Sequence, residues 1–230
     1  EYLSHKKLIF LSDEGWIYEK PDASSARIAS VVVGALLLDK GSKGKYAHVE
    51  LPDGRKGYVL KKDVTDFDQW RKETRPTAGN VLKNAYRFMG TPYLWAGTSA
   101  DMLDCSGFTK TVYMINGVVL ARDASQQYLT GQSVDISHGY DKLQPGDLVF
   151  FGSRNADGTP KRVWHVGIYV GDGRFIHEAG DVHVNSFNPE HPEYSQSYVD
   201  ILVHASRIIG NEDKGLGITS YENNPYFAQQ

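Results

Sequence analysis

Residues 101–115 read DMLDCSGFTKTVYMI, and the interpretation of the whole chain starts from this stretch. Cys105 is the single cysteine among 230 residues, and the run from Phe108 to Ile115 is typical of a helix. A thiol in the first turn of a helix faces backbone N–H groups and the positive end of the helix dipole, which favour the thiolate. Cys105 is therefore a candidate nucleophile, and a buried structural cysteine is the alternative.

The sequence around Cys105 predicts helices first and strands afterwards. Thr77 is a candidate N-cap for a helix over residues 78–89, whose apolar positions recur at helical spacing. An irregular stretch is expected over residues 122–141. Strands are predicted over residues 147–151, 165–170, 174–177 and 198–209. This order indicates an α+β domain in which helices pack on an antiparallel sheet.

The N-terminal part of the chain has a different pattern. Four or five short apolar or alternating segments lie within residues 8–66, separated by turns, and they predict a small β-barrel. The polar stretch at residues 67–77 is interpreted as a linker. We therefore divide the chain into a β-barrel domain at residues 1–66, this linker, a second domain at 78–210 and a polar tail at 211–230.

Composition excludes several classes of function. The formal net charge is −3, so nothing indicates a nucleic-acid partner. No apolar run reaches the roughly 18 residues that span a bilayer. One cysteine excludes an internal disulfide and a multi-cysteine zinc site. We expect no cofactor, and we favour a monomer.

A cysteine nucleophile needs a base and a group that orients the base, and two histidines fit these roles. His165 begins one apolar strand and His177 ends the next. A two-residue turn would put them on opposite faces of the hairpin, whereas a three-residue loop over 171–173 pairs Gly167 with His177 and puts both on one face. We therefore predict the longer loop. A metal site is the alternative, but strand alternation places Glu178 on the other face.

Several motifs occur together in one order along the chain. They are Tyr93-Leu-Trp95-Ala-Gly97, Asp104-Cys105-Ser106-Gly107, Arg122-Asp123, LQPGDLVFF at residues 143–151, HVGIYV at 165–170, and His177. Over residues 78–209 the chain resembles the NlpC/P60 family of papain-like cysteine peptidases, which cut bacterial cell-wall peptides. Residues 1–66 resemble a bacterial SH3-like (SH3b) domain. The combination resembles the subgroup that hydrolyses the bond between γ-D-glutamate and a diamino acid.

The resemblance implies a role for each matching residue. Cys105 is the nucleophile that forms a thioester acyl-enzyme, His165 is the general base, and His177 orients His165. Asp104 pairs with the free amine of an N-terminal L-Ala, and Ser106 donates to the D-Glu carboxylate. The alternatives are structural, since Asp104 suits an N-cap and Ser106 suits the first helical turn. No metal or cofactor is implied.

Further residues are candidates for the walls of the substrate pocket. Those beside Cys105 are Tyr93, whose hydroxyl could stabilise an oxyanion, Trp95, Asp123 and Ser125. From the SH3-like domain, the resemblance implies a tyrosine near the free amine, but Arg55 occupies that place here. Tyr58 is the alternative, although it also suits the barrel core. A cationic Arg55 would repel an ammonium, so the requirement for a free amine stays open.

The sequence thus predicts a cysteine endopeptidase that acts on the γ-D-glutamyl-diamino acid bond of peptidoglycan stem peptides. The alternatives are a thiol-dependent amidase or acyltransferase of the same fold, or a non-catalytic protein that binds the cell wall. The diamino acid is either diaminopimelate or lysine. This substrate implies a periplasmic or extracellular location in a bacterium, with cytoplasmic recycling of turnover peptides as the other location.

Overall fold

The computed structural model describes residues 5–228, and the chain forms two units that each have their own core. One unit comprises residues 1–74 and 221–230, and the other comprises residues 75–220. The terminal residues 1–4 and 229–230, which belong to the predicted domain and tail at 1–66 and 211–230, lie outside the described residues.

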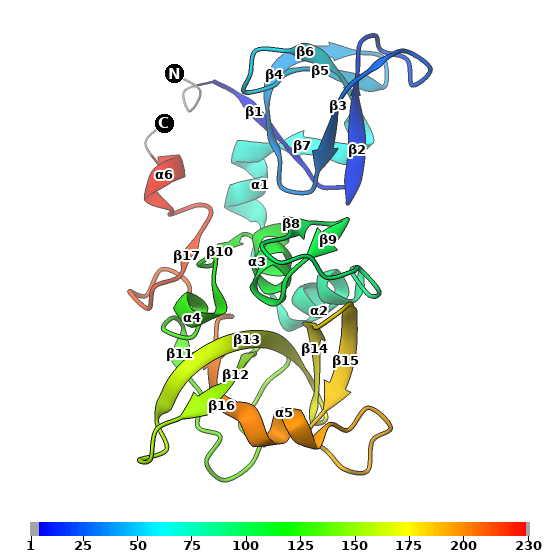
Figure 1. The fold of residues 1–230 in the computed structure, drawn as a ribbon. Coiled ribbons are helices and arrows are strands. Elements are labelled where there is room, and N and C mark those ends of the chain that lie inside the picture. The colour runs from blue at the N-terminus through cyan, green and yellow to red at the C-terminus, as the bar shows by residue number, and fades with distance from the viewer. Residues whose placement is uncertain (1–4, 229–230) are drawn as a thin grey trace. The chain divides into compact units, whose positions relative to one another are not determined.

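The first unit is built on a seven-stranded antiparallel sheet that curves round its own core (Figure 1). The strands are β1 (Lys7–Phe10), β2 (Glu14–Tyr18), β3 (Arg27–Val32), β4 (Leu36–Lys43), β5 (Tyr46–Glu50), β6 (Lys56–Leu60) and β7 (Val64–Asp66), with the 3₁₀ turn η2 (Lys61–Asp63) between the last two. Their order across the sheet is β3-β2-β6-β5-β4-β1-β7.

Alternating burial along these strands explains the core of the first unit. Ile17, Val49 and Val59 are fully or almost fully buried, and their strand neighbours face outward. Gly57 allows β2 and β6 to approach closely, because a Cβ there would lie 2.6 Å from the Tyr18 carbonyl oxygen. The predicted N-terminal β domain is therefore present, with more strands than the four or five expected.

The structure differs from the predicted linker at residues 67–77. Phe67–Glu73 form helix α1, and the Asp66 side chain caps it by accepting from Gln69 N at 2.9 Å. Phe67 and Trp70 are both buried, in an aromatic cluster completed by Tyr221 and Phe227. The polar residues between these aromatic positions gave the stretch the composition of a linker, although three-residue spacing places both rings on one helix face.

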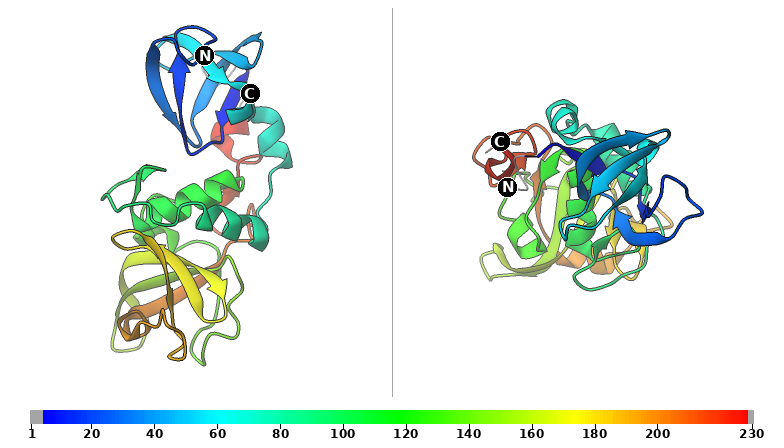
Figure 2. Two further views of the ribbon diagram at one scale, coloured as in Figure 1. Left: turned by 90° about the vertical axis from the view of Figure 1, so that its right-hand side faces the viewer. Right: turned by 90° about the horizontal axis from the view of Figure 1, so that it is seen from above.

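The second unit has helices on both faces of a six-stranded antiparallel sheet (Figure 2). Its strand order is β11-β16-β12-β13-β14-β15. The helices are α2 (Ala78–Tyr86), α3 (Cys105–Ile115), α4 (Ala124–Gln127) and α5 (Gln196–Ile201). The sheet strands are β11 (Gln132–Ser133), β12 (Leu148–Arg154), β13 (Pro160–Gly171), β14 (Arg174–Glu178), β15 (Val182–Ser186) and β16 (Leu202–Arg207). Two short hairpins or pairs, β8 (Thr98–Ser99) with β9 (Met102–Leu103) and β10 (Val118–Val119) with β17 (Thr219–Ser220), complete the unit, and α6 (Pro225–Ala228) follows it. The predicted α+β class is confirmed.

The predicted strand over residues 198–209 was wrong at its start. Residues up to Ile201 belong to α5, and the strand β16 begins at Leu202. Tyr198, Val199 and Ile201 pack against the core formed by Phe151 and its neighbours, at a spacing that one helical turn supplies. The β-branched content of this segment therefore reflects core packing. Strand β15 was not predicted, and it is the one that completes the edge of the sheet beside β14.

The hairpin between β13 and β14 has the predicted pairing, but a β-bulge and a two-residue turn produce it in place of the predicted three-residue loop. Gly167 pairs with His177, as expected, but Gly171 pairs with Arg174, so the turn itself has two residues. The extra residue is Val170, which forms a β-bulge between the paired positions. The bulge restores the parity that a two-residue turn alone would reverse. His165 and His177 consequently lie on the same face of the sheet.

Candidate active site

Cys105 is the first residue of α3, and Asp104 holds this helix start in place. The Asp104 carboxylate accepts from Gly107 N at 2.7 Å and from Ala96 N at 2.8 Å. Arg122 donates to both of its oxygens. The helix also needs Gly107, because a Cβ there would lie 2.0 Å from the Gly97 carbonyl oxygen. These residues thus hold the start of α3, and with it the Cys105 thiol, against the loop that contains Ala96 and Gly97.

The two predicted histidines are joined by a hydrogen bond. His165 Nε2 and His177 Nδ1 are 2.7 Å apart, and their rings are nearly perpendicular. His177 is fully buried. The Tyr198 ring from α5 stacks on His165 and meets His177 edge-on. The structure therefore brings together a base and its orienting group, as the strand parity predicts.

Cys105 lies next to the strand that carries His165. The residue is 8% exposed, and its thiol donates to the Trp164 carbonyl oxygen at 3.9 Å. Burial, followed by the charge of Asp104, raises the pKa of Cys105 to about 11, although the N–H groups of Val166 and Ser106 oppose this shift. Burial also lowers the pKa of His165 to about 4. Without substrate the pair is therefore a neutral thiol and a neutral imidazole, not the thiolate that the helix position alone favours.

A pocket of about 220 Å³ opens beside the sulfur. Its walls include six residues that the sequence placed near the nucleophile, namely Tyr93, Trp95, Asp104, Ser106, Asp123 and Ser125, together with Ala124, Val163 and Trp164. Trp95 is 81% exposed and Tyr93 is 42% exposed, so neither ring is committed to core packing. Asp104 combines both predicted settings, since it caps α3 and also lines the pocket.

Arg55 and Tyr58 belong to the first unit. The Arg55 guanidinium is paired with Asp53 at 2.7 Å and also donates to the Ile28 carbonyl oxygen. Tyr58 stacks on His48 across β5 and β6, with ring centroids 4.9 Å apart. Both side chains thus have partners within their own sheet, and their predicted contact with substrate stays a prediction.

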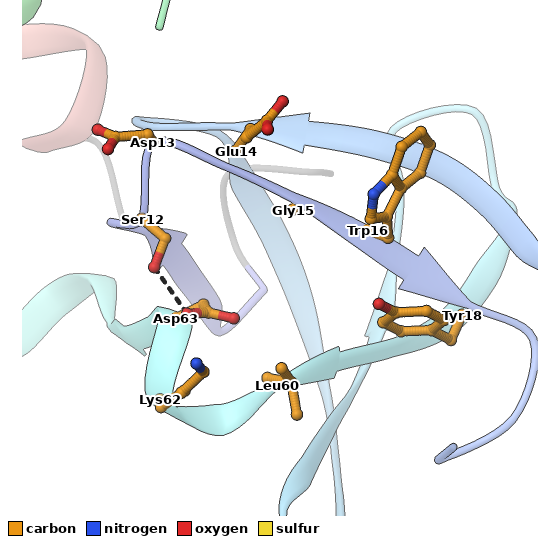
Figure 3. A pocket seen from close by; sticks show the side chains of 9 residues that line it. All are labelled: Ser12, Asp13, Glu14, Gly15, Trp16, Tyr18, Leu60, Lys62 and Asp63. Carbon is orange, nitrogen blue, oxygen red and sulfur yellow. Dashed lines mark hydrogen bonds between the residues drawn. The ribbon is translucent and has the colours of Figure 1, made fainter. Parts of the chain in front are cut away.

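The first unit has a hollow of its own, of about 480 Å³ (Figure 3). Trp16 and Tyr18 stand along β2, and Asp13 and Glu14 lie where this strand begins. The opposite wall contains Leu60, Lys62 and Asp63, and Ser12 Oγ donates to Asp63 at 2.6 Å. Sequence reasoning did not single out this combination of aromatic rings and carboxylates.

Sequence reasoning also missed residues of the second unit that support the site. Gln127 is fully buried and ties α4 to α3 by donating to the Ser106 carbonyl oxygen at 3.1 Å. Tyr198 was assigned to a strand. Arg122 was noted only as part of a motif. A polar residue that the fold buries, such as Gln127, leaves no periodic signal in a single sequence.

Within residues 5–228 no three His, Cys, Asp or Glu side chains gather closely enough to hold a metal ion. Among the same residues, no helix has the length and apolar character needed to cross a membrane.

Comparison with known proteins agrees with this site. The model of the NlpC/P60 family matches residues 90–224, which include Cys105 and both histidines. The chain belongs to the NlpC/P60 family. A solved NlpC/P60 family protein from Bacillus cereus superposes with a TM-score of 0.73 at 29% identity, over 88% of this chain and 63% of that one.

Two curated proteins extend the comparison of this NlpC/P60 chain. The gamma-D-glutamyl-L-lysine dipeptidyl-peptidase of Bacillus cereus is 40% identical over 129 residues, which are 56% of this chain and 37% of that protein. Dipeptidyl-peptidase 6 of Lysinibacillus sphaericus is 30% identical over 189 residues, which are 78% of this chain and 64% of that protein. The chain therefore spans between about a third and two thirds of these relatives.

Proposed function

We propose that this protein is a cysteine peptidase that hydrolyses the γ-D-glutamyl-diamino acid bond of peptidoglycan stem peptides. The observation that carries the proposal is the hydrogen-bonded pair of His165 and His177 on the strands beside Cys105, at a pocket lined by Asp104 and Ser106. The similar proteins of Bacillus cereus and Bacillus subtilis, both gamma-D-glutamyl-L-lysine dipeptidyl-peptidases, support this choice of substrate.

Because Cys105 and His165 are both neutral before substrate binds, the first step includes a proton transfer between them. His165 takes the thiol proton of Cys105 as the sulfur attacks the γ-carbonyl carbon, and a tetrahedral oxyanion forms. His165 then returns the proton to the leaving amine, which departs and leaves a thioester on Cys105. A water molecule, deprotonated by His165, hydrolyses the thioester and releases the new γ-carboxylate and the free thiol.

The proposed mechanism assigns two groups to stabilise the oxyanion. Cys105 N–H belongs to the first residue of α3, where a helix offers backbone donors and the positive end of its dipole. The Tyr93 hydroxyl is the second donor, on the pocket wall. Burial raises the pKa of Tyr93, which keeps its phenol protonated and able to donate.

Substrate recognition is assigned to the charged groups at the start of α3. The Asp104 carboxylate is already bound by Arg122 and two backbone N–H groups, so a substrate ammonium would share this acceptor. Ser106 Oγ accepts from Arg122 at 3.0 Å and donates to Asp104 Oδ1 at 3.3 Å, and in the proposed complex it turns its hydroxyl to a substrate carboxylate. We therefore keep the predicted roles, in which Asp104 binds the substrate amine and Ser106 binds the D-Glu carboxylate.

The test uses L-Ala-γ-D-Glu-L-Lys as substrate. The native protein should release lysine and the dipeptide, and Cys105→Ser should abolish release. His165→Gln should lower kcat by about 10²- to 10⁴-fold, the usual contribution of a general base. His138, an exposed histidine, supplies the matched control, since His138→Gln should leave kcat unchanged. Full activity of the cysteine variant would refute the proposal.

Two further substrates refine the assignment. The same peptide with an acylated N-terminus tests whether the free amine is needed, and a diaminopimelate peptide tests the leaving group. Addition of an amine nucleophile, followed by mass analysis, distinguishes hydrolysis from the acyl transfer expected of an acyltransferase. We further propose action on peptidoglycan in the periplasm or outside the cell, which localisation of the tagged full-length protein would test.

A further inference from the structure

Asn185 on β15 lies beside His177 and adds a third polar side chain to the row that His165 and His177 form on one face of the sheet. On β14, His177 lies opposite Gly167 of β13 and opposite His183 of β15. His165 and Asn185 are each two residues from those partners, so both lie on the same face as His177 and at diagonal positions. Asn185 Oδ1 is 2.9 Å from His177 Nε2. The polar row therefore crosses three neighbouring strands.

The second contact of Asn185 fixes the direction of its amide. Asn185 Nδ2 lies 3.1 Å from the Glu193 backbone carbonyl oxygen, and a carbonyl oxygen can only accept. The amide must therefore turn its NH₂ group toward Glu193 and its oxygen toward His177. Since that oxygen also only accepts, the proton of neutral His177 has to be on Nε2.

The position of the proton on His177 also determines which nitrogen of the base, His165, carries a proton. With its proton on Nε2, His177 presents the Nδ1 lone pair to His165 Nε2, which must then carry a proton and donate it across the 2.7 Å contact. The remaining nitrogen of neutral His165, Nδ1, is left unprotonated. The opposite tautomer of His177 would place two acceptors against each other at Asn185, so the amide selects one state of the whole row.

We propose that Asn185 is a positioning residue that sets the tautomers of both histidines and thereby leaves His165 Nδ1 free to accept the proton of Cys105. The inference rests on the proposed function, because it concerns the same proton transfer. Asn185 acts through His177 and does not contact the reacting atoms. It also favours the imidazolium that forms during the reaction, since His177 Nδ1 stays an acceptor for His165.

Other titratable groups surround the two histidines and must be considered in any pH profile. They are Cys105 on α3, Glu178 on β14, Asp181 just before β15, His183 on β15, and Tyr198 on α5. Among these described groups none is hydrogen-bonded to His177, whereas Asn185 is. The tautomer is therefore set at Asn185.

The experiment compares two substitutions at this position in the full chain. Asn185→Leu has a similar volume but no acceptor, so kcat should fall about 10- to 100-fold, as expected for loss of a hydrogen bond that holds His177 as the acceptor for the charged form of His165, with KM unchanged. Asn185→Asp keeps the acceptor and should restore most of kcat. Its negative charge should move the acid limb of the kcat/KM profile to higher pH, because it stabilises imidazolium.

A control variant separates positioning from loss of structure. Asn188 on the same segment contacts His191 at 3.2 Å and is not part of the row. Asn188→Leu should disturb this segment without changing kcat. Imidazole ¹⁵N NMR should show His177 protonated on Nε2 in the native protein and a mixture of tautomers in Asn185→Leu.

The outcomes distinguish this inference from the proposed function. A folded Asn185→Leu variant with native kcat, or with the native His177 tautomer, would overturn the inference even if Cys105→Ser is inactive. A fall in kcat for Asn185→Asp as large as that for Asn185→Leu would also overturn it, because a structural role would explain both. An active Cys105→Ser variant would instead refute the proposed function itself.

Discussion

At the scale of single residues, the protonation of Cys105 reflects two opposing influences. The start of α3 and the N–H groups of Ser106 and Val166 favour a thiolate, whereas burial and Asp104 favour a thiol. Burial has the larger effect, and the pKa of Cys105 rises to about 11. The helix position that makes the residue recognisable in the sequence therefore does not by itself produce a resting thiolate.

Alkylation of Cys105 should consequently depend on pH. Since only the thiolate reacts and the thiol pKa lies near 11, the rate with iodoacetamide in the absence of substrate should rise about tenfold per pH unit between pH 7 and 10. Mass spectrometry of the single modified cysteine gives the rate, and glutathione is the reference. A rate that is already on a plateau at pH 6 would indicate a resting thiolate–imidazolium pair instead.

Glu178 is a buried carboxyl group whose two oxygens have no hydrogen-bond partner. Burial, and then the charges of Asp181 and Asp104, raise its pKa to about 7 from an ordinary value of 4.5. The folded state therefore prefers the protonated acid. Its contribution to stability is fully present below pH 4.5 and is lost as the pH rises through 7.

Replacement of Glu178 should thus stabilise the protein only at higher pH. We expect Glu178→Met to raise the free energy of unfolding by about 3 kcal/mol at pH 8, which is the energy equivalent of the pKa shift, and to change it little at pH 4.5. Urea denaturation at the two pH values measures the difference. Equal stabilisation at both would show that the charge of Glu178 is not the cause.

The residues that sequence reasoning found are those with a local or periodic signal. Cys105 is singled out by its place before a helix, and His165 and His177 by strand parity. Asn185 has no such signal, because its role depends on the pairing of β15, a strand that was not predicted. The charge partner of Asp104 lies 18 positions away at Arg122, and single-sequence patterns carry no information on that contact.

At the scale of elements, the start of α3 depends on the ion pair between Asp104 and Arg122. The carboxylate is largely buried, and burial opposes its ionised form, whereas Arg122 and the N–H groups of Gly107 and Ala96 hold its pKa below the ordinary value. Removal of the guanidinium would leave a buried carboxylate without its counter-charge. The element that carries the nucleophile would then lose much of its anchorage.

We expect Arg122→Gln to lower the free energy of unfolding by about 2 kcal/mol, because Arg122 is partly exposed and breaking a fully buried pair costs more. Arg122→Lys, which retains the charge but not the two-pronged geometry, should lose less. The urea midpoint of each variant is the measurement. A loss for the lysine variant equal to that for glutamine would show that geometry, not charge, holds the helix start.

Helices and strands were predictable from the sequence where their buried residues recur at a single helical or strand spacing. Helix α3 and strands β12 and β14 each lie close to their predicted bounds, whereas β13, predicted over residues 165–170, already begins at Pro160. Helices α1 and α5 were not predicted, since α1 is mostly polar and α5 is rich in strand-forming residues. In both cases tertiary packing of a few large side chains, Trp70 in α1 and Tyr198 in α5, decides the conformation over local composition.

At the scale of the whole molecule, the last residues of the chain belong to the same unit as the first. Tyr221 and Phe227 pack on Phe67 and Trp70, with ring centroids between 5.2 and 6.3 Å apart, and on each other at 5.1 Å. The chain therefore passes between the two units twice. The polar tail expected from the sequence supplies apolar side chains to the core of the N-terminal unit.

Loss of one of these rings should weaken that unit alone. Tyr221→Ala should destabilise it by about 2 kcal/mol, less than for a fully buried aromatic side chain, because Tyr221 is partly buried. Hydrogen exchange followed by mass spectrometry should show faster exchange in β1, β7 and α1, with unchanged protection in β12–β14. Tyr226 is exposed, so Tyr226→Ala is the control, and faster exchange throughout the chain would contradict two separate cores.

The bulge at Val170 determines how much the length of the catalytic hairpin can vary. A regular hairpin with a two-residue turn and one residue fewer would still place Gly167 opposite His177. Loss of one residue near Val170 is therefore absorbed by the disappearance of the bulge, and both histidines keep their face. Gain of one residue in β14 opposite Val170 is absorbed in the same way, because an even number of residues between Gly167 and His177 again leaves a regular two-residue turn. Natural changes of one residue at the bulge should consequently be compatible with activity, whereas loss or gain of one residue between His165 and Gly167 should be selected against, because it moves His165 to the other face.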